Sequence, residues 1–132
     1  MSTPQAQNWQ SHPFSIERQQ GKTPGTVIFR FCGPFTARDM YGTLTPLELQ
    51  KIFEFRSTPA EQLPAVNILD LTQVPYVDSS GLGMIVAQHV RCQNRGLKMI
   101  AAGAVPRVME LFKMTKVDGF LGLAATVEEV DN

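Results

Sequence analysis

The sequence is short of cysteine and has no long apolar run. Its only cysteines, Cys32 and Cys92, stand far apart and match neither a zinc-ligand spacing nor a redox pair. They are therefore expected to be buried, reduced thiols, as in a cytoplasmic protein, and no metal site is predicted. No stretch approaches the roughly 20 apolar residues of a membrane span, so membrane insertion is not expected.

The sequence also has no excess of either charge. Lys and Arg number 12, and Asp and Glu number 12, which gives a formal net charge of +0. Proteins that bind nucleic acid usually carry a basic excess or a basic stripe, so nucleic acid is not an expected partner. Residues 1–13 have no apolar core and do not resemble a secretion signal.

The length of 132 residues favours a single domain, and a chain of this size folds without help from a metal or a disulfide. Residues 1–12 are polar and are predicted to form a flexible N-terminal tail. Residues 13–132 are predicted to form the folded domain.

Strand and helix patterns alternate along this domain. Residues 14–20 and 26–32 are predicted to form two antiparallel strands, joined by the turn residues of 21–25. The other expected elements are a helical turn at 36–41, a helix from Thr45-Pro46 to about 55, a strand at 65–71, a helix at 79–95, a strand at 97–103, a helix at 105–115, and a strand followed by a helical turn within 120–130. The prediction is an α/β domain with a mixed sheet of about four to five strands and about four helices.

The helix predicted at 79–95 has an apolar stripe at helical spacing. The stripe consists of Leu82, Ile85, Val86, His89 and Val90. The opposite side holds Met84, Gln88, Arg91 and Arg95, so these side chains are expected to be exposed. His89 is expected to be a packing residue rather than a catalytic base.

The segment 78–83, Asp-Ser-Ser-Gly-Leu-Gly, follows the central strand at the sheet edge where open α/β folds place their sites. A hydrolase nucleophile is not supported, because the flanking residues do not form G-x-S-x-G. The two glycines make only G-x-G, a weak phosphate-binding signal. Asp78 or Ser79 is expected to cap the helix. Gly81 is expected to admit the chain into the helix, and Gly83 to let the helix sit close to the sheet.

A cap alone does not account for two serines and two glycines in an exposed position. A hydroxyl at the start of a helix is accessible to an enzyme and is held on a rigid part of the fold. The positive end of the helix also tolerates an added phosphate. A phosphate would add a charge of about −1.5 to −2 and would change a docking surface without unfolding the domain. One of the serines is therefore predicted to be the substrate of a modifying enzyme.

Three segments closely resemble the STAS domain of bacterial anti-sigma factor antagonists: NILDL (67–71), DSSGLGMIV (78–86) and GLKMIAAGAVPRVMELFKMTKVDGFL (96–121). The resemblance extends over about 65–130 and implies an STAS-like fold. It also implies partner switching. The unphosphorylated antagonist binds an anti-sigma factor, which is a serine kinase, and so frees a sigma factor. The kinase then phosphorylates the serine after the acid, and a PP2C-type phosphatase resets the switch.

On this resemblance Ser79 is the expected phosphoacceptor, with Ser80 as the alternate. The expected partner contacts around it are Thr36, Asp78, Ser80, Gly81, Leu82 and Met84. Thr36 stands where family members often carry an acid, and "YGTLTP" (41–46) is read as an extra loop. The residues themselves support no enzymatic activity and call for no cofactor.

Two other roles remain open. The missing acid at Thr36 favours an STAS subunit that binds without being phosphorylated, attached to a lipid-transport ATPase. A stressosome-type scaffold is the related alternative, and it would form a large assembly. For the antagonist, a monomer or weak dimer is expected.

Overall fold

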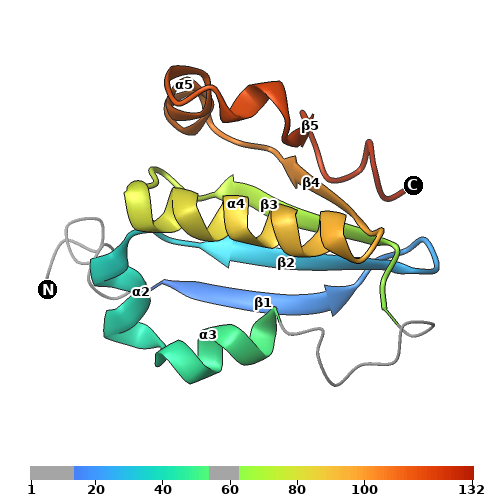
Figure 1. The fold of residues 1–132 in the computed structure, drawn as a ribbon, viewed down its shortest axis with the longest axis horizontal. Helices are drawn as coiled ribbons and strands as arrows, with labels where there is room; N and C mark the ends of the chain where they lie inside the picture. Colours follow the sequence, from blue (N-terminus) through green and yellow to red (C-terminus); the bar gives the residue numbers. More distant parts are fainter. Residues whose placement is uncertain (1–13, 54–62) are drawn as a thin grey trace, which may run out of the picture.

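The computed structural model describes residues 14–53 and 63–132 (Figure 1). Within these ranges the chain forms one five-stranded sheet. Its strands are β1 (Ser15–Gln20), β2 (Thr26–Cys32), β3 (Val66–Gln73), β4 (Lys98–Ala102) and β5 (Gly122–Ala124). The helices are α2 (Ala37–Thr43), α3 (Pro46–Ile52), α4 (Ser79–Asn94) and α5 (Pro106–Met114), followed by the 3-10 turn η2 (Val117–Gly119). The predicted α/β class and mixed sheet are confirmed. The predicted tail, 1–12, lies outside the described residues.

The strands lie side by side in chain order, β1-β2-β3-β4-β5. The pair β1–β2 is antiparallel, and the other neighbours are parallel. Successive crossovers of one hand that advance in one direction across a sheet place their helices on the same face. Accordingly, Met40 of α2, Leu49 of α3, Ile85 of α4 and Phe112 of α5 all belong to one buried cluster.

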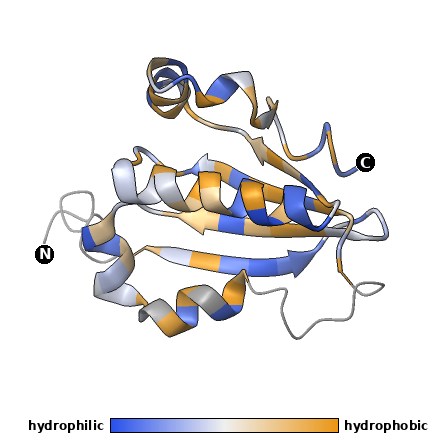
Figure 2. Cartoon of the chain, viewed as in Figure 1, coloured by the Kyte–Doolittle hydropathy of each residue, from blue (hydrophilic) through white to orange (hydrophobic). Residues whose placement is uncertain are grey.

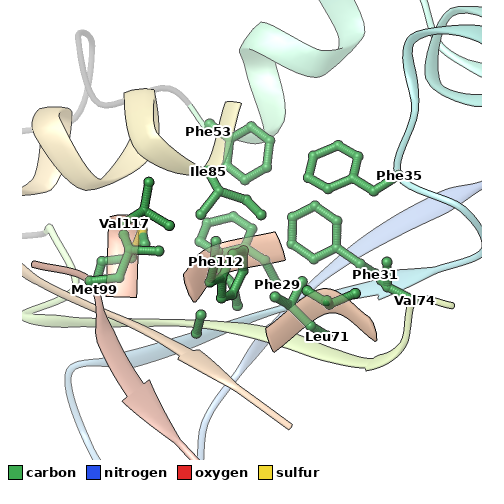
Figure 3. Packing of buried hydrophobic residues seen from close by; sticks show 14 of the residues in the cluster. Phe29, Phe31, Phe35, Phe53, Leu71, Val74, Ile85, Met99, Phe112 and Val117 are labelled. Carbon is green, nitrogen blue, oxygen red and sulfur yellow. The ribbon is translucent and has the colours of Figure 1, made fainter. Parts of the chain in front are cut away.

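That cluster is rich in phenylalanine (Figure 3). Phe29 and Phe31 point from β2 toward the helices, because alternate residues of a strand face the same side. The ring of Phe31 lies 4.9 Å from that of Phe35, and the ring of Phe29 lies 5.0 Å from that of Phe53. Each such pair contributes about 0.5–1.5 kcal/mol beyond its buried area. The aromatic core thus fixes the loop at Phe35, directly before α2.

The C-terminal residues cover part of the other face of the sheet. Val127 packs there against Ile28 and Ile68. Asp131 anchors the segment, because its carboxylate accepts hydrogen bonds from the backbone N–H groups of Lys22 and Thr23, each at 2.8 Å. The chain end is therefore tied to the turn between β1 and β2.

The predicted orientation of α4 is right in part: Leu82, Ile85 and Val86 of the predicted stripe pack in or against the main core cluster, but the centre of the buried face lies elsewhere on the helix. The buried residues of the helix are Gly81, Ile85, Gln88 and Cys92, and Val90 is 43% exposed. Gln88 is buried with its polar atoms satisfied: the amide oxygen accepts from Arg91 at 2.8 Å, and the amide nitrogen contacts the sulfur of Cys92 at 3.9 Å. Figure 2 shows apolar and polar positions mixed along this helix. A pattern that counts only apolar residues misses a buried face that contains glycine and glutamine.

The segment 41–46 is not an extra loop. Its first three residues complete α2, and Thr45 and Pro46 begin α3. Thr45 forms a capping box with Glu48, because the hydroxyl accepts from the Glu48 N–H and the Glu48 carboxylate accepts from the Thr45 N–H. The Thr45-Pro46 helix start predicted from the sequence is confirmed.

Both cysteines are free thiols. Cys92 is buried beneath α4, and this burial raises the pKa of its thiol to about 11. Cys32 is only half-buried, so the prediction that both thiols are buried holds for Cys92 alone.

Candidate functional site

The loops that lead into α2 and α4 lie side by side at the carboxyl edge of the sheet. Phe35 and Val77 form an isolated parallel bridge between these loops. The Phe35 N–H donates to the Tyr76 carbonyl at 3.0 Å, and the Asp78 N–H donates to the Phe35 carbonyl at 3.2 Å. These bonds continue the pairing of β2 with β3 beyond the strands, so α2 and α4 begin next to each other.

Asp78 joins the two helix starts through one carboxylate. One oxygen accepts from the Gly81 N–H at 2.9 Å and caps α4, as the sequence predicts. The other oxygen accepts from the Ala37 N–H in the first turn of α2 at 3.0 Å, a contact that the sequence did not reveal. Because both oxygens are occupied by backbone donors, the carboxylate is held in one orientation beside Ser79.

Ser79 is the first residue of α4, and it is exposed. Ser80 is half-buried. The first turn of the helix holds no acidic residue, so the carboxylate at this end is that of the Asp78 cap, whose charge is shared with the backbone donors of Gly81 and Ala37. Of the two hydroxyls, that of Ser79 is the more accessible to a second protein.

The two glycines have roles that differ from the predicted ones. Gly81 is buried, and a Cβ at this position would come within 2.1 Å of the Phe35 carbonyl oxygen. Gly83 is exposed, and a Cβ there would meet nothing within 4 Å. The close approach therefore occurs at Gly81, against the neighbouring loop. The predicted contact of Gly83 with the sheet is wrong.

Thr36 is 8% exposed and caps α2. Its hydroxyl oxygen accepts from the Asp39 N–H at 3.1 Å, and the hydroxyl donates to the Asp39 carboxylate at 2.5 Å. The position where the resemblance implied an acid is thus occupied by the residue that caps α2. The nearest acid, Asp39, lies one helical turn further on.

Leu82 and Met84 are half-buried and pack against the main core cluster. The prediction that Met84 is exposed is therefore wrong. The error arose because the buried face of α4 was placed on the wrong side of Met84. Both side chains leave only part of their surface to a partner.

Sequence reasoning missed a pair of side chains near Ser79. The guanidinium carbon of Arg107 lies 4.8 Å from the centre of the Tyr76 ring. Tyr76 belongs to the loop before α4, and Arg107 is an exposed residue in the first turn of α5. The pair brings the start of α5 to the same edge of the sheet as the starts of α2 and α4.

His89 is too far from Ser79 to act as a base for its hydroxyl. It lies on the same helix about 15 Å further along the axis, at 1.5 Å per residue. Its ring packs against Phe120 with centroids 5.3 Å apart, so it is a half-buried packing residue, as predicted.

Among residues 14–53 and 63–132, no three His, Cys, Asp or Glu side chains are grouped to hold a metal ion. In the same ranges no helix is long and apolar enough to cross a bilayer.

A family model described as the STAS domain matches residues 17–130. The chain belongs to the STAS domain family. The match includes β2 to β5 and most of β1, together with the Asp78 cap and Ser79 at the start of α4. The resemblance seen in the sequence is thereby confirmed.

Solved structures share this STAS fold. A candidate anti-sigma factor antagonist from Thermotoga maritima matches with a TM-score of 0.66 at 17% identity, over 94% of each chain. A sulfate transporter family protein from Wolinella succinogenes matches with a TM-score of 0.65 at 20% identity, over 83% of this chain and 84% of that one. SpoIIAA, a Bacillus cell fate determinant, matches in its phosphorylated form with a TM-score of 0.61 at 18% identity, over 88% of this chain and 96% of that one. At such identities the likeness shows a shared fold, and it does not assign the binding partners of those proteins to this chain.

Proposed function

We propose that this STAS domain is an anti-sigma factor antagonist controlled by phosphorylation of Ser79. The unphosphorylated form binds an anti-sigma factor serine kinase in the cytoplasm, and the bound kinase releases its sigma factor. A PP2C-type phosphatase restores the unphosphorylated form. The observation that carries the proposal is the exposure of Ser79 at the first residue of α4, beside a carboxylate fixed by two backbone donors.

The chemistry of the switch is simple at this position. The Ser79 hydroxyl oxygen attacks the γ-phosphorus of ATP, ADP leaves, and the hydroxyl proton passes to a base on the kinase. The new group adds a charge of about −1.5 to −2. The positive end of α4 accommodates that anion, so the domain is expected to remain folded while its docking surface becomes more negative.

The proposed contact surface lies around the starts of α2 and α4. Of the residues expected there, Ser80, Leu82 and Met84 keep part of their surface accessible. Thr36 and Gly81 are buried, so they shape the surface through the capped start of α2 and the packed loop at Phe35. Asp78 does the same by holding the two helix starts together.

The proposal is tested by incubating the protein with ATP and the anti-sigma serine kinase encoded in the same genome. Mass spectrometry is expected to find one phosphate, on Ser79, in the parent and in Ser80→Ala, and none in Ser79→Ala. Calorimetry is expected to show that Ser79→Ala binds the kinase like the parent and that Ser79→Asp binds more weakly, because an added charge enters the contact. No phosphate at either serine, or equal binding by all variants, would reject the proposal.

A second candidate function is an STAS subunit that binds without being phosphorylated, in a lipid-transport ATPase or a stressosome-type scaffold. The observation in its favour is Thr36, which places a helix cap where relatives often carry an acid. A transporter operon around the gene would support the first form. A large assembly in size-exclusion chromatography would support the scaffold, whereas the antagonist is expected to elute as a monomer or weak dimer.

A further inference from the structure

A polar pocket of about 350 Å³ lies between the sheet and the C-terminal residues, on the face opposite to the helices. Arg30 of β2 and Asp70 of β3 are neighbours in the register and line this pocket. Both point to this face, because the residues beside them in each strand point to the helices. The other lining residues are Thr72, Gln73, Thr126, Val127 and Glu128. Val127 is the only apolar residue of this lining, so the pocket suits a polar ligand.

Arg30 is held in one orientation at the wall of the pocket. One oxygen of the Asp70 carboxylate, whose side chain is only 6% exposed, accepts from the Arg30 Nε at 3.1 Å. The other oxygen accepts from the N–H and the hydroxyl of Thr72 at 3.1 Å and 2.7 Å. The Arg30 side chain is 41% exposed, and its two terminal nitrogens have no hydrogen-bond partner among the described residues. A guanidinium fixed in this way presents a fork of donors that matches the two oxygens of a carboxylate.

Glu128 supplies an opposite charge to the same pocket. It is exposed, and it belongs to the C-terminal residues that form one side of the lining. The only ion pair among the described residues joins Arg30 to Asp70, so Glu128 and Arg30 line one pocket without pairing with each other. A simple anion on Arg30 would face the Glu128 carboxylate, and a simple cation on Glu128 would face the guanidinium. A ligand that carries both charges meets neither repulsion.

We propose that this pocket binds a small zwitterion, an α-amino acid with a short side chain. The ligand carboxylate accepts hydrogen bonds from the terminal nitrogens of Arg30, and the ligand ammonium group pairs with Glu128. The volume is near the lower end of the range of about 300–1,000 Å³ that small-molecule pockets occupy. Because Val127 offers the only apolar contact in the lining, a long apolar side chain would find little to pack against.

This site is separate from the proposed phosphorylation switch. Ser79 begins α4, and Ile85 of that helix belongs to the core cluster on the helix-covered face of the sheet. Arg30 and Asp70 point to the opposite face. No lining residue of the pocket belongs to the proposed contact surface around the starts of α2 and α4. The inference therefore stands or falls independently of Ser79.

The test uses the full chain labelled with nitrogen-15 and three probes of similar size. L-Alanine carries both charges, propionate lacks the ammonium group, and L-alaninamide lacks the carboxylate. L-Alanine is expected to shift the amide signals of Arg30, 70–73 and 126–128, and to saturate. Each of the other probes keeps only one of the two contacts, so it is expected to bind about tenfold more weakly or less.

Two variants with matched controls locate the contacts. Glu128→Gln is expected to weaken L-alanine about fivefold and not to weaken propionate, because it removes only the partner of the ammonium group. Arg30→Lys keeps the charge but removes the fork of donors, so it is expected to weaken both probes about tenfold. Glu110→Gln in α5 and Arg95→Lys at the end of α4 change exposed residues outside the pocket and are expected to bind like the parent. Thermal denaturation shows whether each variant keeps the fold.

Three results would overturn the proposal. The first is a singly charged probe that binds as tightly as L-alanine, which would assign the pocket to simple anions or simple cations. The second is an absence of saturation with L-alanine, or a set of shifts elsewhere on the protein. The third is a Glu128→Gln variant that binds L-alanine like its control, Glu110→Gln. This third result decides the matter even if Arg30→Lys does not fold, because Glu128 is exposed and takes no part in the ion pair.

Discussion

Gly81 lies directly against the backbone carbonyl of Phe35. A Cβ at Gly81 would come within 2.1 Å of the carbonyl oxygen and 2.9 Å of a methyl carbon of Val77. The same carbonyl accepts the N–H of Asp78. The start of α4 and the loop that enters α2 are thus in contact without an intervening side chain, and the position of Ser79 depends on this contact.

Replacement of Gly81 by alanine is therefore expected to destabilise the fold. The new methyl group must displace backbone atoms, which costs about 1–3 kcal/mol in the free energy of unfolding. Gly83→Ala is the matched control, because it adds the same methyl group to the same helix where nothing lies within 4 Å. It is expected to raise stability by up to about 1 kcal/mol through helix propensity. Urea denaturation measures both, and a stability gain in Gly81→Ala would contradict the close approach.

Sequence patterns predicted the order of strands and helices because each element has its own local signal. The β-branched and aromatic residues of 26–32 and the Thr45-Pro46 helix start are examples, and the structure has a strand and a helix at these places. The centre of the buried face of α4 was missed because it depends on tertiary contacts. Gln88 is buried since Arg91 and Cys92 satisfy its amide, and Gly81 is buried since the Phe35 carbonyl needs the space. Neither residue carries an apolar signal.

The site was predicted in part for the same reason. Asp78 as a cap is a local feature, readable from the residues that follow it. Its second bond, to Ala37, joins segments far apart in the chain and has no local signature. The proximity of Arg107 to Tyr76 likewise arises only when α5 reaches the carboxyl edge of the sheet.

Loss of the Asp78 carboxylate is expected to loosen both helix starts. Asp78→Ala removes a cap and a bond to α2, each worth about 1 kcal/mol, so the free energy of unfolding is expected to fall by about 2 kcal/mol. Asp78→Asn keeps one acceptor oxygen and is expected to lose about half as much. Glu110→Ala, at an exposed acid of α5, is the control for loss of a carboxylate. Chemical denaturation at pH 7 distinguishes these cases, and equal stability of Asp78→Ala and Glu110→Ala would refute the dual role.

The anchor at Asp131 predicts a pH dependence of stability. The hydrogen bonds from the backbone N–H groups of Lys22 and then Thr23 lower the pKa of this carboxyl below its ordinary value of 3.8. A carboxyl whose pKa is lower in the folded state stabilises the fold above its unfolded-state pKa and loses this effect as pH falls through its folded-state pKa. The stability difference between the parent and Asp131→Asn is therefore expected to be constant from pH 7 to about 5 and to shrink below pH 4.

Denaturation curves recorded across this pH range check the Asp131 prediction. Glu110→Gln serves as the control, because Glu110 is an exposed acid of α5 and not part of the β1–β2 turn that Asp131 holds. A difference for Asp131→Asn that grows as the pH is lowered would have the wrong sign, and the proposed anchoring would then have to be abandoned.

The pair formed by Arg107 and Tyr76 predicts a second contact with the kinase, on the basis of the proposed function. Arginine and tyrosine are common where a few side chains dominate an interface, and this arginine is exposed while its guanidinium is stacked on the ring. Arg107→Ala is expected to weaken binding of the unphosphorylated protein to the kinase about tenfold. Tyr76→Phe keeps the ring beneath the guanidinium and is expected to bind within about twofold of the parent.

The control for this prediction is Arg95→Ala, which removes an exposed arginine from the opposite end of α4. Calorimetric titration of the kinase with each variant gives the affinities, and thermal denaturation shows whether the fold is unchanged. If Ser79→Asp weakens binding of the kinase and Arg107→Ala does not, the proposed control by phosphorylation of Ser79 is supported, and the kinase-binding surface does not include α5. If Arg107→Ala weakens binding as strongly as expected while Arg95→Ala does not, the docking surface includes the starts of α2, α4 and α5, and the phosphate on Ser79 would be added within it.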